Sequence, residues 1–230
     1  MANISTNLPS KPARLHVRDD IQRSADRRTT SYTRYGKRVL DVTLVLVSAP
    51  FVLPIIALLA FAVIVTGQAP FYVQKRVGLN GKIFNMWKLR TMLPNAEQLL
   101  EDYLTENPEA RAEWETKQKL MRDPRVTPIG NWLRKKSLDE LPQLFNVLNG
   151  TMSLVGPRPM MVDQREQYHG DAYYNMRPGM TGLWQVSDRN ECSFAGRVRF
   201  DNAYARIVSL GTDIKVLFQT VMVVIRGTGV

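Results

Sequence analysis

The sequence of 230 residues predicts an α+β protein that is mainly helical, with one small β-hairpin and an amino-terminal membrane helix broken by proline. Three observations predict this fold class. A run of 24 residues carries no charge, two short apolar segments flank an Asn-Gly dipeptide, and much of the remaining chain has the composition of helices. We expect a flexible polar tail over residues 1–33, a re-entrant membrane helix over residues 34–68 and a folded cytoplasmic domain over residues 69–230.

The charge of the chain points to an anionic partner. There are 31 Lys and Arg against 21 Asp and Glu, which gives a formal net charge of +10. Nucleic acid, an anionic membrane surface and phosphorylated small molecules would all satisfy such a charge. Cys192 is the only cysteine and His16 and His169 are the only histidines, so the sequence excludes an internal disulfide and offers no zinc-ligand spacing.

The amino-terminal tail and the apolar run that follows it differ sharply in composition. Residues 1–33 are rich in Arg, Ser and Thr and have few large apolar side chains, so they cannot bury enough surface to order themselves. From Val42 to Val65 the chain is uncharged, and a helix of this length covers roughly 36 Å, enough to cross a bilayer core. The run begins far from the first residue and no small-residue cleavage pattern follows it, which argues against a secretory signal.

Two features favour a helix that enters one leaflet and returns. Pro50 and Pro54 each remove a helix hydrogen bond, and Ser48 is placed to satisfy freed backbone groups. Both flanks of the run are basic, whereas a spanning helix usually has its basic excess on the cytoplasmic side. These basic residues are Arg34, Lys37 and Arg38 before the run and Lys75, Arg76, Lys82 and Lys88 after it. We expect a break at Ser48 and Pro50 with both ends in the cytoplasm; a spanning helix and a buried helix of a soluble core are the alternatives.

The chain beyond the apolar run alternates between short strands and helices. Residues 71–92 predict two strands joined by a tight turn at Asn80-Gly81. Residues 95–121 predict two helices with charged, solvated faces, interrupted at Asn107-Pro108. Within residues 128–148 we expect a helix that carries Ile129, Trp132 and Leu133, then the segment 134–143, then the run LPQLFNVLNG, which ends at an Asn-Gly stop. The last helix, near residues 212–227, has one apolar side that packs in the core or lies in the bilayer interface.

The decapeptide RKKSLDELPQ, residues 134–143, places two adjacent carboxylates, Asp139 and Glu140, behind three cations. A capping box offers a purely structural explanation, with Ser137 capping a helix and Glu140 reaching back to it. Pro142 argues against that register, because it would then lie beyond the first turn. With Asp139 as the N-cap, Pro142 falls at the third helical position, which tolerates it. The acid pair is therefore expected at a helix start, and the decapeptide alone does not separate a cap from a catalytic pair.

Three later segments combine Gly, Pro and Arg or carry a further acid. They are GPRP at residues 156–159, RPGMTGLWQVSDRN at residues 177–190, and Asp201 just before NAYAR. Gly and Pro fix an irregular backbone, and the guanidinium beside them is suited to bidentate binding of phosphate oxygens. Each loop taken singly is also typical of an ordinary solvated turn. Together with the acid pair, the cations and the apolar run, they indicate phosphoryl chemistry at a membrane surface.

Four long motifs, in this order, resemble the bacterial sugar transferase family, and specifically its small monotopic polyprenyl-phosphate phosphoglycosyltransferases. The motifs are KRVLDV, QKRVGLNGKIFNMWKLRTM, LRKKSLDELPQLFNVLNGTMSLVGPRP and RPGMTGLWQVSDRN, and the resemblance runs from Lys37 to Gly227. Larger members carry further transmembrane helices and a further domain, so this chain is expected to correspond to the catalytic module alone. The family's Ser-Pro break is here Ser-Ala-Pro, with Ala49 between Ser48 and Pro50, so the position of the bend shifts by a residue or two.

The resemblance assigns roles to the candidate residues. It implies that Asp139 attacks the β-phosphorus of a UDP-sugar, expels UMP and carries the sugar phosphate until undecaprenyl phosphate accepts it, the priming step of exopolysaccharide synthesis. Mg²⁺ is the expected cofactor, with Glu140 as its first ligand and Asp201 as a weaker second. The residues expected to bind substrate phosphates are Arg134, Arg158, Arg177 and Arg189. The enzyme would lie on the cytoplasmic face of the bacterial inner membrane, without nucleic acid and with a homodimer as one option.

Two other functions remain open at this point. A single-displacement transferase would use the same residues in a ternary complex, with Asp139 and Glu140 only holding metal. A basic, membrane-anchored adaptor or nucleic-acid binder would explain the charge and the anchor but leaves the acid pair and the ordered loops without a purpose. The sugar is not identified, although we favour a hexose without an acetamido group, such as galactose or glucose.

Overall fold

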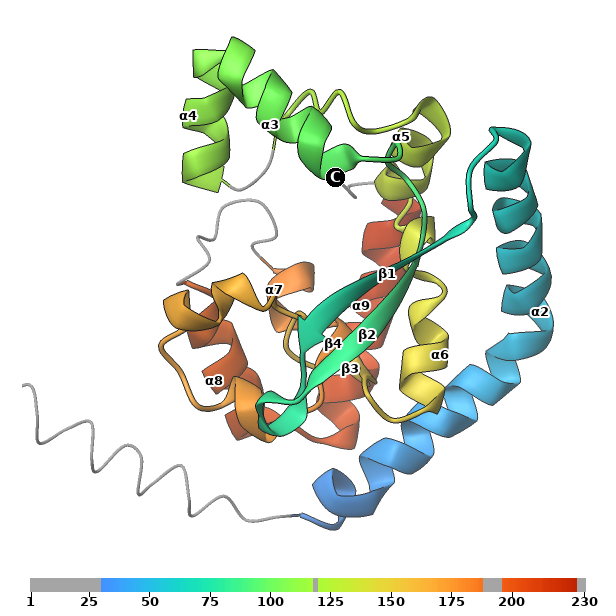
Figure 1. Cartoon of the computed structure of the whole chain (residues 1–230). Coiled ribbons are helices and arrows are strands. Elements are labelled where there is room, and N and C mark those ends of the chain that lie inside the picture. Colours follow the sequence, from blue (N-terminus) through green and yellow to red (C-terminus); the bar gives the residue numbers. More distant parts are fainter. Residues whose placement is uncertain (1–29, 118–119, 188–195, 227–230) are drawn as a thin grey trace, which may run out of the picture.

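The structure is a computed structural model that describes residues 30–117, 120–187 and 196–226, and it is mostly helical (Figure 1). The predicted tail therefore lies outside the described residues up to residue 29. The predicted mainly helical architecture is confirmed for the described part of the chain. The longer elements after the membrane helix are α3 (Ala96–Glu106), α4 (Pro108–Lys117), α5 (Pro128–Lys135), α6 (Gln143–Leu148), α8 (Arg197–Ile207) and α9 (Leu210–Arg226).

The predicted hairpin is present. Strand β1 (Phe71–Val77) pairs antiparallel with β2 (Ile83–Leu89). The connection contains Asn80 at φ 57° and Gly81 at φ 72°, a left-handed pair that Asn and Gly adopt at low steric cost. The twisted hairpin lies across the middle of the molecule in Figure 1, with α6 beside β2. The helices α3 and α4 also confirm the prediction of two helices interrupted at Asn107.

A second, parallel pair of strands was not predicted. Strand β3 (Ser153–Val155) pairs with β4 (Gly179–Thr181), with Ser153 opposite Gly179 and Val155 opposite Thr181. Three residues per strand are too few to show a period of two along the sequence. The pairing needs glycine, because a Cβ at Gly179 would lie 2.1 Å from the backbone nitrogen of Gly156. Two segments that are well separated in sequence therefore lie in backbone contact.

The apolar run forms α2 (Lys37–Val65), preceded by a short π-helical turn at Tyr32–Gly36. Pro50 and Pro54 lie inside α2, and the helix continues through both of them. Figure 1 shows that α2 changes direction near its middle but does not turn back on itself. The predicted break at Ser48 is thus a bend within a continuous helix. The Ser48 hydroxyl donates to the Val45 carbonyl of the same helix at 3.0 Å, two residues before Pro50. Ser48 therefore bonds within the helix and does not interrupt it.

The described residues contain one helix long and apolar enough to cross a membrane, Tyr32–Val65, and only 22% of its most apolar window is buried against the rest of the chain. Most of its large side chains face outward. Those more than half exposed are Tyr35, Val39, Leu46, Val47, Phe51, Leu58, Phe61 and Val65. An apolar surface of this size needs a cover other than water, and a lipid bilayer provides one.

Polar contacts fix the amino end of α2 to the domain. Lys37 Nζ is 2.6 Å from the buried carboxylate of Asp213, and Arg38 donates to the carbonyls of Val147 and Leu148 at the end of α6. Three residues after Arg38, the buried carboxylate of Asp41 accepts from the Leu154 backbone N–H at 3.0 Å. The end of α2 is therefore joined to α6, β3 and α9.

Apolar contacts fix the carboxyl half of α2. One buried cluster joins it to β2 and α5, and the partly buried leucines on both sides of the acid pair pack against the same cluster. Its buried members are Leu59, Ala60, Val63, Leu89 and Leu133, with Ile129, Leu138 and Leu141 against them. Helix α2 and the predicted catalytic segment therefore share one core.

The Asp41 contact yields a stability prediction. Asp41→Ala leaves the Leu154 N–H buried without its acceptor, which we expect to lower the free energy of unfolding by about 1–3 kcal/mol. Thermal unfolding in detergent measures this change. Val39→Ala, at a residue that is 64% exposed on the same helix, serves as the control and should change the midpoint little. Equal midpoints for the two variants would contradict the anchoring role of Asp41.

Candidate functional site

The acid pair lies on a tight turn between α5 and α6. Asp139 and Glu140 belong to a three-residue 3₁₀ turn, Leu138–Glu140, which Ser137 enters with a positive φ of 54° and without a side-chain cap. The predicted cap is therefore wrong in both registers, since α6 begins at Gln143 with Pro142 as its N-cap. The positive φ ends α5 and starts a new turn, so the acids precede the helix and do not cap it.

Two cations from other elements flank the acid pair. Lys88, near the end of β2, places its Nζ 2.9 Å from Glu140 Oε1 and 3.8 Å from Asp139 Oδ2. Arg134, in the last turn of α5, donates from Nε to Thr91 Oγ1 at 2.9 Å and acts electrostatically on Asp139. Lys88 is therefore shared by both acids, and Arg134 is held by its own hydrogen bond.

Burial dominates the electrostatics of Asp139. The residue is 7% exposed, and its burial raises the pKa of the carboxyl above the ordinary range, because the charged form loses hydration. Lys88 and Arg134 oppose this rise in pKa, while Glu140 adds to it. The carboxylate at this position thus depends on the two cations for its charge.

The turn opens onto a small cleft lined mainly by polar groups. Its lining residues come from the hairpin, the acid turn and the two loops after β3 and β4, and they are Arg76, Met86, Lys88, Glu140, Gln143, Arg158, Pro159, Gly179, Met180 and Gln185. Burial and the nearby guanidinium of Arg158 lower the pKa of Arg76 to about 10. Two guanidinium groups that repel each other in one cleft favour an anion between them.

The parallel strands explain how the GPRP and GLWQ segments meet. Because β3 and β4 run in the same direction, the loops that follow them emerge at the same edge. Backbone hydrogen bonds tie the loops, from Gly156 N to Thr181 O and from Gly179 N to Pro157 O, both at 2.8 Å. Arg158 from the first loop lies 5.5 Å from the ring centre of Trp184 in α7 (Leu183–Val186). Arg158 is therefore held by the second loop.

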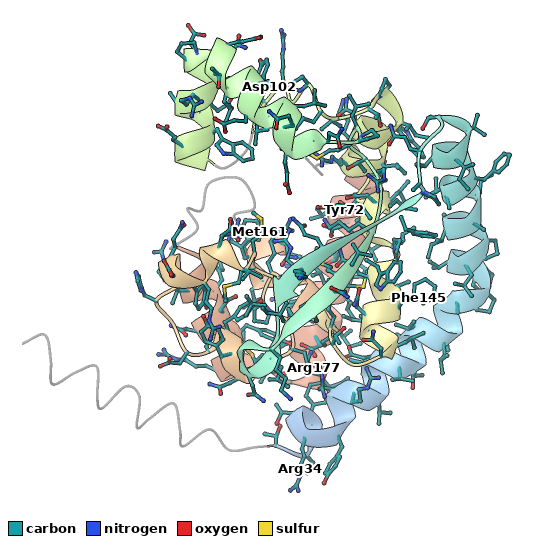
Figure 2. The ribbon with its side chains drawn as sticks, in the orientation of Figure 1. Arg34, Tyr72, Asp102, Phe145, Met161 and Arg177 are labelled. Carbon is teal, nitrogen blue, oxygen red and sulfur yellow. The ribbon has the colours of Figure 1, made fainter. Side chains whose placement is uncertain are left out.

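One of the predicted phosphate-binding arginines, Arg177, does not line the cleft. Arg177 donates from Nε to the carbonyl of Gly150 at 2.9 Å, beyond the carboxyl end of α6, and Figure 2 shows it near the end of the molecule where α2 begins. The acid pair precedes the opposite end of α6. Arg189 lies outside the described residues. Arg134 and Arg158 are thus the two predicted arginines that the structure brings towards the acid pair and the cleft.

Asp201 lies apart from the acid pair. Its carboxylate, on α8, accepts from the Tyr168 hydroxyl at 2.7 Å, and burial raises the pKa of Asp201 to about 6. Within the described residues no three His, Cys, Asp or Glu side chains converge on one point, so Asp201 does not join Asp139 and Glu140. Glu140 lines the cleft and is partly exposed, which suits Mg²⁺, since this ion commonly takes one or two carboxylates and completes its shell with water and substrate phosphates.

Sequence reasoning missed several residues of the cleft, among them Arg76, Lys88 and Gln185. The signal for the first two is the alternation of the hairpin, in which Phe84, Met86 and Lys88 share one face. A lysine that follows two buried apolar residues at a period of two is expected to face inward. Gln185 gave no such signal, because its position depends on the parallel strand pair.

Comparison with known proteins gives a consistent picture. The family model described as "Bacterial sugar transferase" matches residues 32–227. The chain is 46% identical to the undecaprenyl-phosphate galactose phosphotransferase of Salmonella typhimurium over 86% of its own length and 42% of the relative. It is 44% identical to the exopolysaccharide production protein ExoY of Rhizobium meliloti, over 84% of this chain and 87% of that protein. It is 37% identical to the UDP-glucose:undecaprenyl-phosphate glucose-1-phosphate transferase of Escherichia coli over 82% of this chain and 40% of that protein.

The buried carboxyl of Asp201 gives a prediction about pH. The pKa of the Asp201 carboxyl is about 6 in the folded protein against an ordinary value of 3.8, so the folded protein binds this proton more tightly than the unfolded chain does. The stability that protonation of Asp201 contributes is therefore complete below pH 3.8 and is lost as the pH rises through about 6. Asp201→Asn cannot titrate, and the difference in unfolding midpoint between it and the wild type should shift in favour of Asn between pH 5 and pH 7.5. Thermal scans at both pH values measure this shift. A Mg²⁺-dependent stabilisation that is present in the wild type and lost in Asp201→Asn would instead favour a metal ligand.

Proposed function

This chain belongs to the bacterial sugar transferase family, and on that basis we propose that it transfers a sugar 1-phosphate from a UDP-sugar to undecaprenyl phosphate, releasing UMP and priming exopolysaccharide synthesis. The chain spans about two fifths of several of its relatives and most of the ExoY proteins, which supports assigning the transfer step to the matched segment. Relatives named for galactose and for glucose support a simple hexose as the sugar. The observation that carries the proposal is the buried Asp139 between Lys88 and Arg134 at the edge of a cationic cleft.

The proposed reaction has two displacements at one phosphorus atom. A carboxylate oxygen of Asp139 attacks the β-phosphorus, the bond to the bridging oxygen of the diphosphate breaks, and UMP leaves with that oxygen. The sugar phosphate is then an acyl phosphate on Asp139. A phosphate oxygen of undecaprenyl phosphate attacks the same phosphorus, the acyl phosphate bond breaks, and the carboxylate is restored as the polyprenyl diphospho-sugar forms.

The surrounding residues supply charge and position for these steps. Asp139 attacks as a carboxylate, and Lys88 and Arg134 favour that form against the effect of burial. Arg76 and Arg158 offer donors to the diphosphate oxygens across the cleft. Glu140 would hold Mg²⁺, which neutralises charge on the diphosphate when bound. Phosphoryl transfer relies mainly on such positioning and charge, which the cleft provides.

We further propose that the protein is monotopic, with both ends of α2 on the cytoplasmic side. The same folded domain contacts α2 at Lys37 to Asp41 and again at Leu59 to Val63. A helix that crossed the bilayer would carry those two sets of contacts to opposite faces, yet they belong to one body with a polar cleft. A bent helix in one leaflet, with the domain against both of its ends, satisfies all of these contacts.

The acid pair is tested by separating its two members. Neighbours in a tight turn point in different directions, so their roles should be separable. We expect Asp139→Asn to release no UMP and to form no lipid product at any Mg²⁺ concentration, because an amide cannot form the acyl phosphate. Glu140→Gln should also lose most activity, by roughly 100-fold or more, but should recover part of it as Mg²⁺ is raised.

The assay uses membranes, undecaprenyl phosphate, Mg²⁺ and a panel of UDP-sugars, with UMP release and trapping of a labelled sugar phosphate on the protein as readouts. UDP-galactose and UDP-glucose are the expected substrates. Turnover by Asp139→Asn, or turnover of the wild type without a trapped intermediate, would support a single displacement instead. Full activity of both variants would remove the catalytic role of the pair, and no turnover with any UDP-sugar would favour an adaptor.

The topology is tested by labelling single cysteines on both sides of α2. In a Cys192→Ser background, Ser31→Cys and Ala69→Cys place an exposed thiol before and after the helix. We expect an impermeant maleimide to label both only after the inner membrane is permeabilised. Labelling of the Ser31→Cys variant in intact spheroplasts would show that α2 crosses the membrane.

A further inference from the structure

Gln185 lines the cleft, and its side-chain oxygen is a buried acceptor that no described residue uses. Gln185 is 7% exposed, and its Nε2 donates to the Met180 carbonyl at 3.1 Å. A carbonyl only accepts, so the amide nitrogen must face Met180 and the oxygen must point away from it. Oε1 is buried and has no hydrogen-bond partner among the described residues. A buried carbonyl without a partner is costly and indicates that a donor completes it.

The backbone holds Gln185 rigidly in this position. Gly182 precedes α7, and a Cβ there would lie 2.2 Å from the Gly156 carbonyl and 3.1 Å from Gln185 Oε1. The absence of that side chain lets the turn after β4 pack on the loop after β3 and leaves room around the amide oxygen. Gln185 N donates to the Gly182 carbonyl at 3.0 Å, which closes the turn. The backbone that positions the acceptor is therefore preformed.

The chemistry of the cleft separates Gln185 from the groups that bind phosphate. Arg76, Lys88 and Arg158 present positively charged donors, which match phosphate oxygens. A neutral amide oxygen repels a phosphate and attracts an N–H or O–H group. A nucleotide sugar carries such donors only on its uncharged parts, namely the imide N–H of uracil and the hydroxyls of ribose and the transferred sugar.

We propose that Gln185 determines substrate specificity, with its Oε1 accepting a hydrogen bond from an uncharged donor of the nucleotide sugar, either the uracil imide or a sugar hydroxyl. The inference rests on the proposed function and adds to it a residue that reads the neutral part of the substrate. If the donor is the imide, cytosine is rejected at the same point, because its ring N3 carries no hydrogen and would place a lone pair against Oε1.

The test removes the acceptor while keeping the volume of the side chain. Gln185→Met is compared with the wild type and with Thr220→Val, which removes the 2.6 Å Thr181–Thr220 hydrogen bond behind β4 without changing a residue of the cleft lining. Binding of UMP, CMP and inorganic pyrophosphate to the full chain in nanodiscs is measured by titration calorimetry. The KM and kcat for the UDP-sugar follow from UMP release.

We expect Gln185→Met to weaken UMP binding roughly tenfold, the loss typical of one hydrogen bond at a buried site, and to reduce the preference for UMP over CMP. Pyrophosphate binding should stay unchanged, which also shows that the cleft is folded. If a sugar hydroxyl is the donor, UMP binding stays unchanged and the KM for the UDP-sugar rises roughly tenfold with little change in kcat. Gln185→Ala replaces Gln185→Met if pyrophosphate binding is lost in the latter.

Unchanged UMP binding together with an unchanged KM would overturn the proposal. An equal loss of pyrophosphate and UMP binding in both Gln185 variants would also overturn it, because the residue would then only support the fold. These outcomes leave the proposed function intact when the wild type is active. A wild type that binds neither UMP nor a UDP-sugar would remove the proposed function and this inference together.

Discussion

The contact between α2 and the acid turn is the constraint on which the rest of the site depends. Leu89 and Leu138 pack with the carboxyl half of α2. Lys88 directly precedes Leu89 in β2, and Asp139 directly follows Leu138 in the turn, so both charged residues of the site adjoin this contact. The same short segments therefore contact α2 with one side chain and carry a charged group of the site on the next. The acid turn and the cation beside it are therefore positioned by the same contacts that hold α2 against the domain.

A second constraint is the close backbone contact between the loops that follow β3 and β4. The glycines at residues 156, 179 and 182 allow this contact, and a methyl group at any of them would lie within 2.4 Å of backbone atoms. The contact holds Arg158 near Arg76 despite their mutual repulsion, which the packing of the loops must offset. Such a site is electrostatically strained without an anion, and an anionic ligand relieves that strain. Part of the net charge of +10, which suggested an anionic partner, is thus concentrated in this cleft.

The predictable parts of this protein were those encoded by local patterns. The hairpin follows from Asn80-Gly81, the two charged helices from their composition and from Pro108, and the acid pair from its unusual place behind three cations. The parallel strands were missed, because their pairing joins segments about 26 residues apart with no local period. The cap was misassigned, because Ser137 takes a left-handed conformation, with φ 54°, which serine seldom adopts and which no local sequence pattern predicts. The sequence predicted phosphate binding for Arg134, Arg158 and Arg177 alike. Only the tertiary contacts show that Arg134 and Arg158 lie towards the acid pair and the cleft and that Arg177 does not.

The four buried aspartates of the described residues show why Asp139 stands out chemically. Asp41, Asp201 and Asp213 each accept a hydrogen bond of 3.0 Å or less from a backbone N–H, a tyrosine or a lysine in a distant part of the chain. These three acids hold elements together, and their oxygens are engaged in doing so. Asp139 differs, because its hydrogen bond comes from its own backbone N–H and the Lys88 nitrogen lies 3.8 Å away, closer to Glu140. A buried carboxylate that is stabilised by nearby positive charge but not tied down by it keeps an oxygen available for a new bond, which is the condition that a covalent nucleophile must meet.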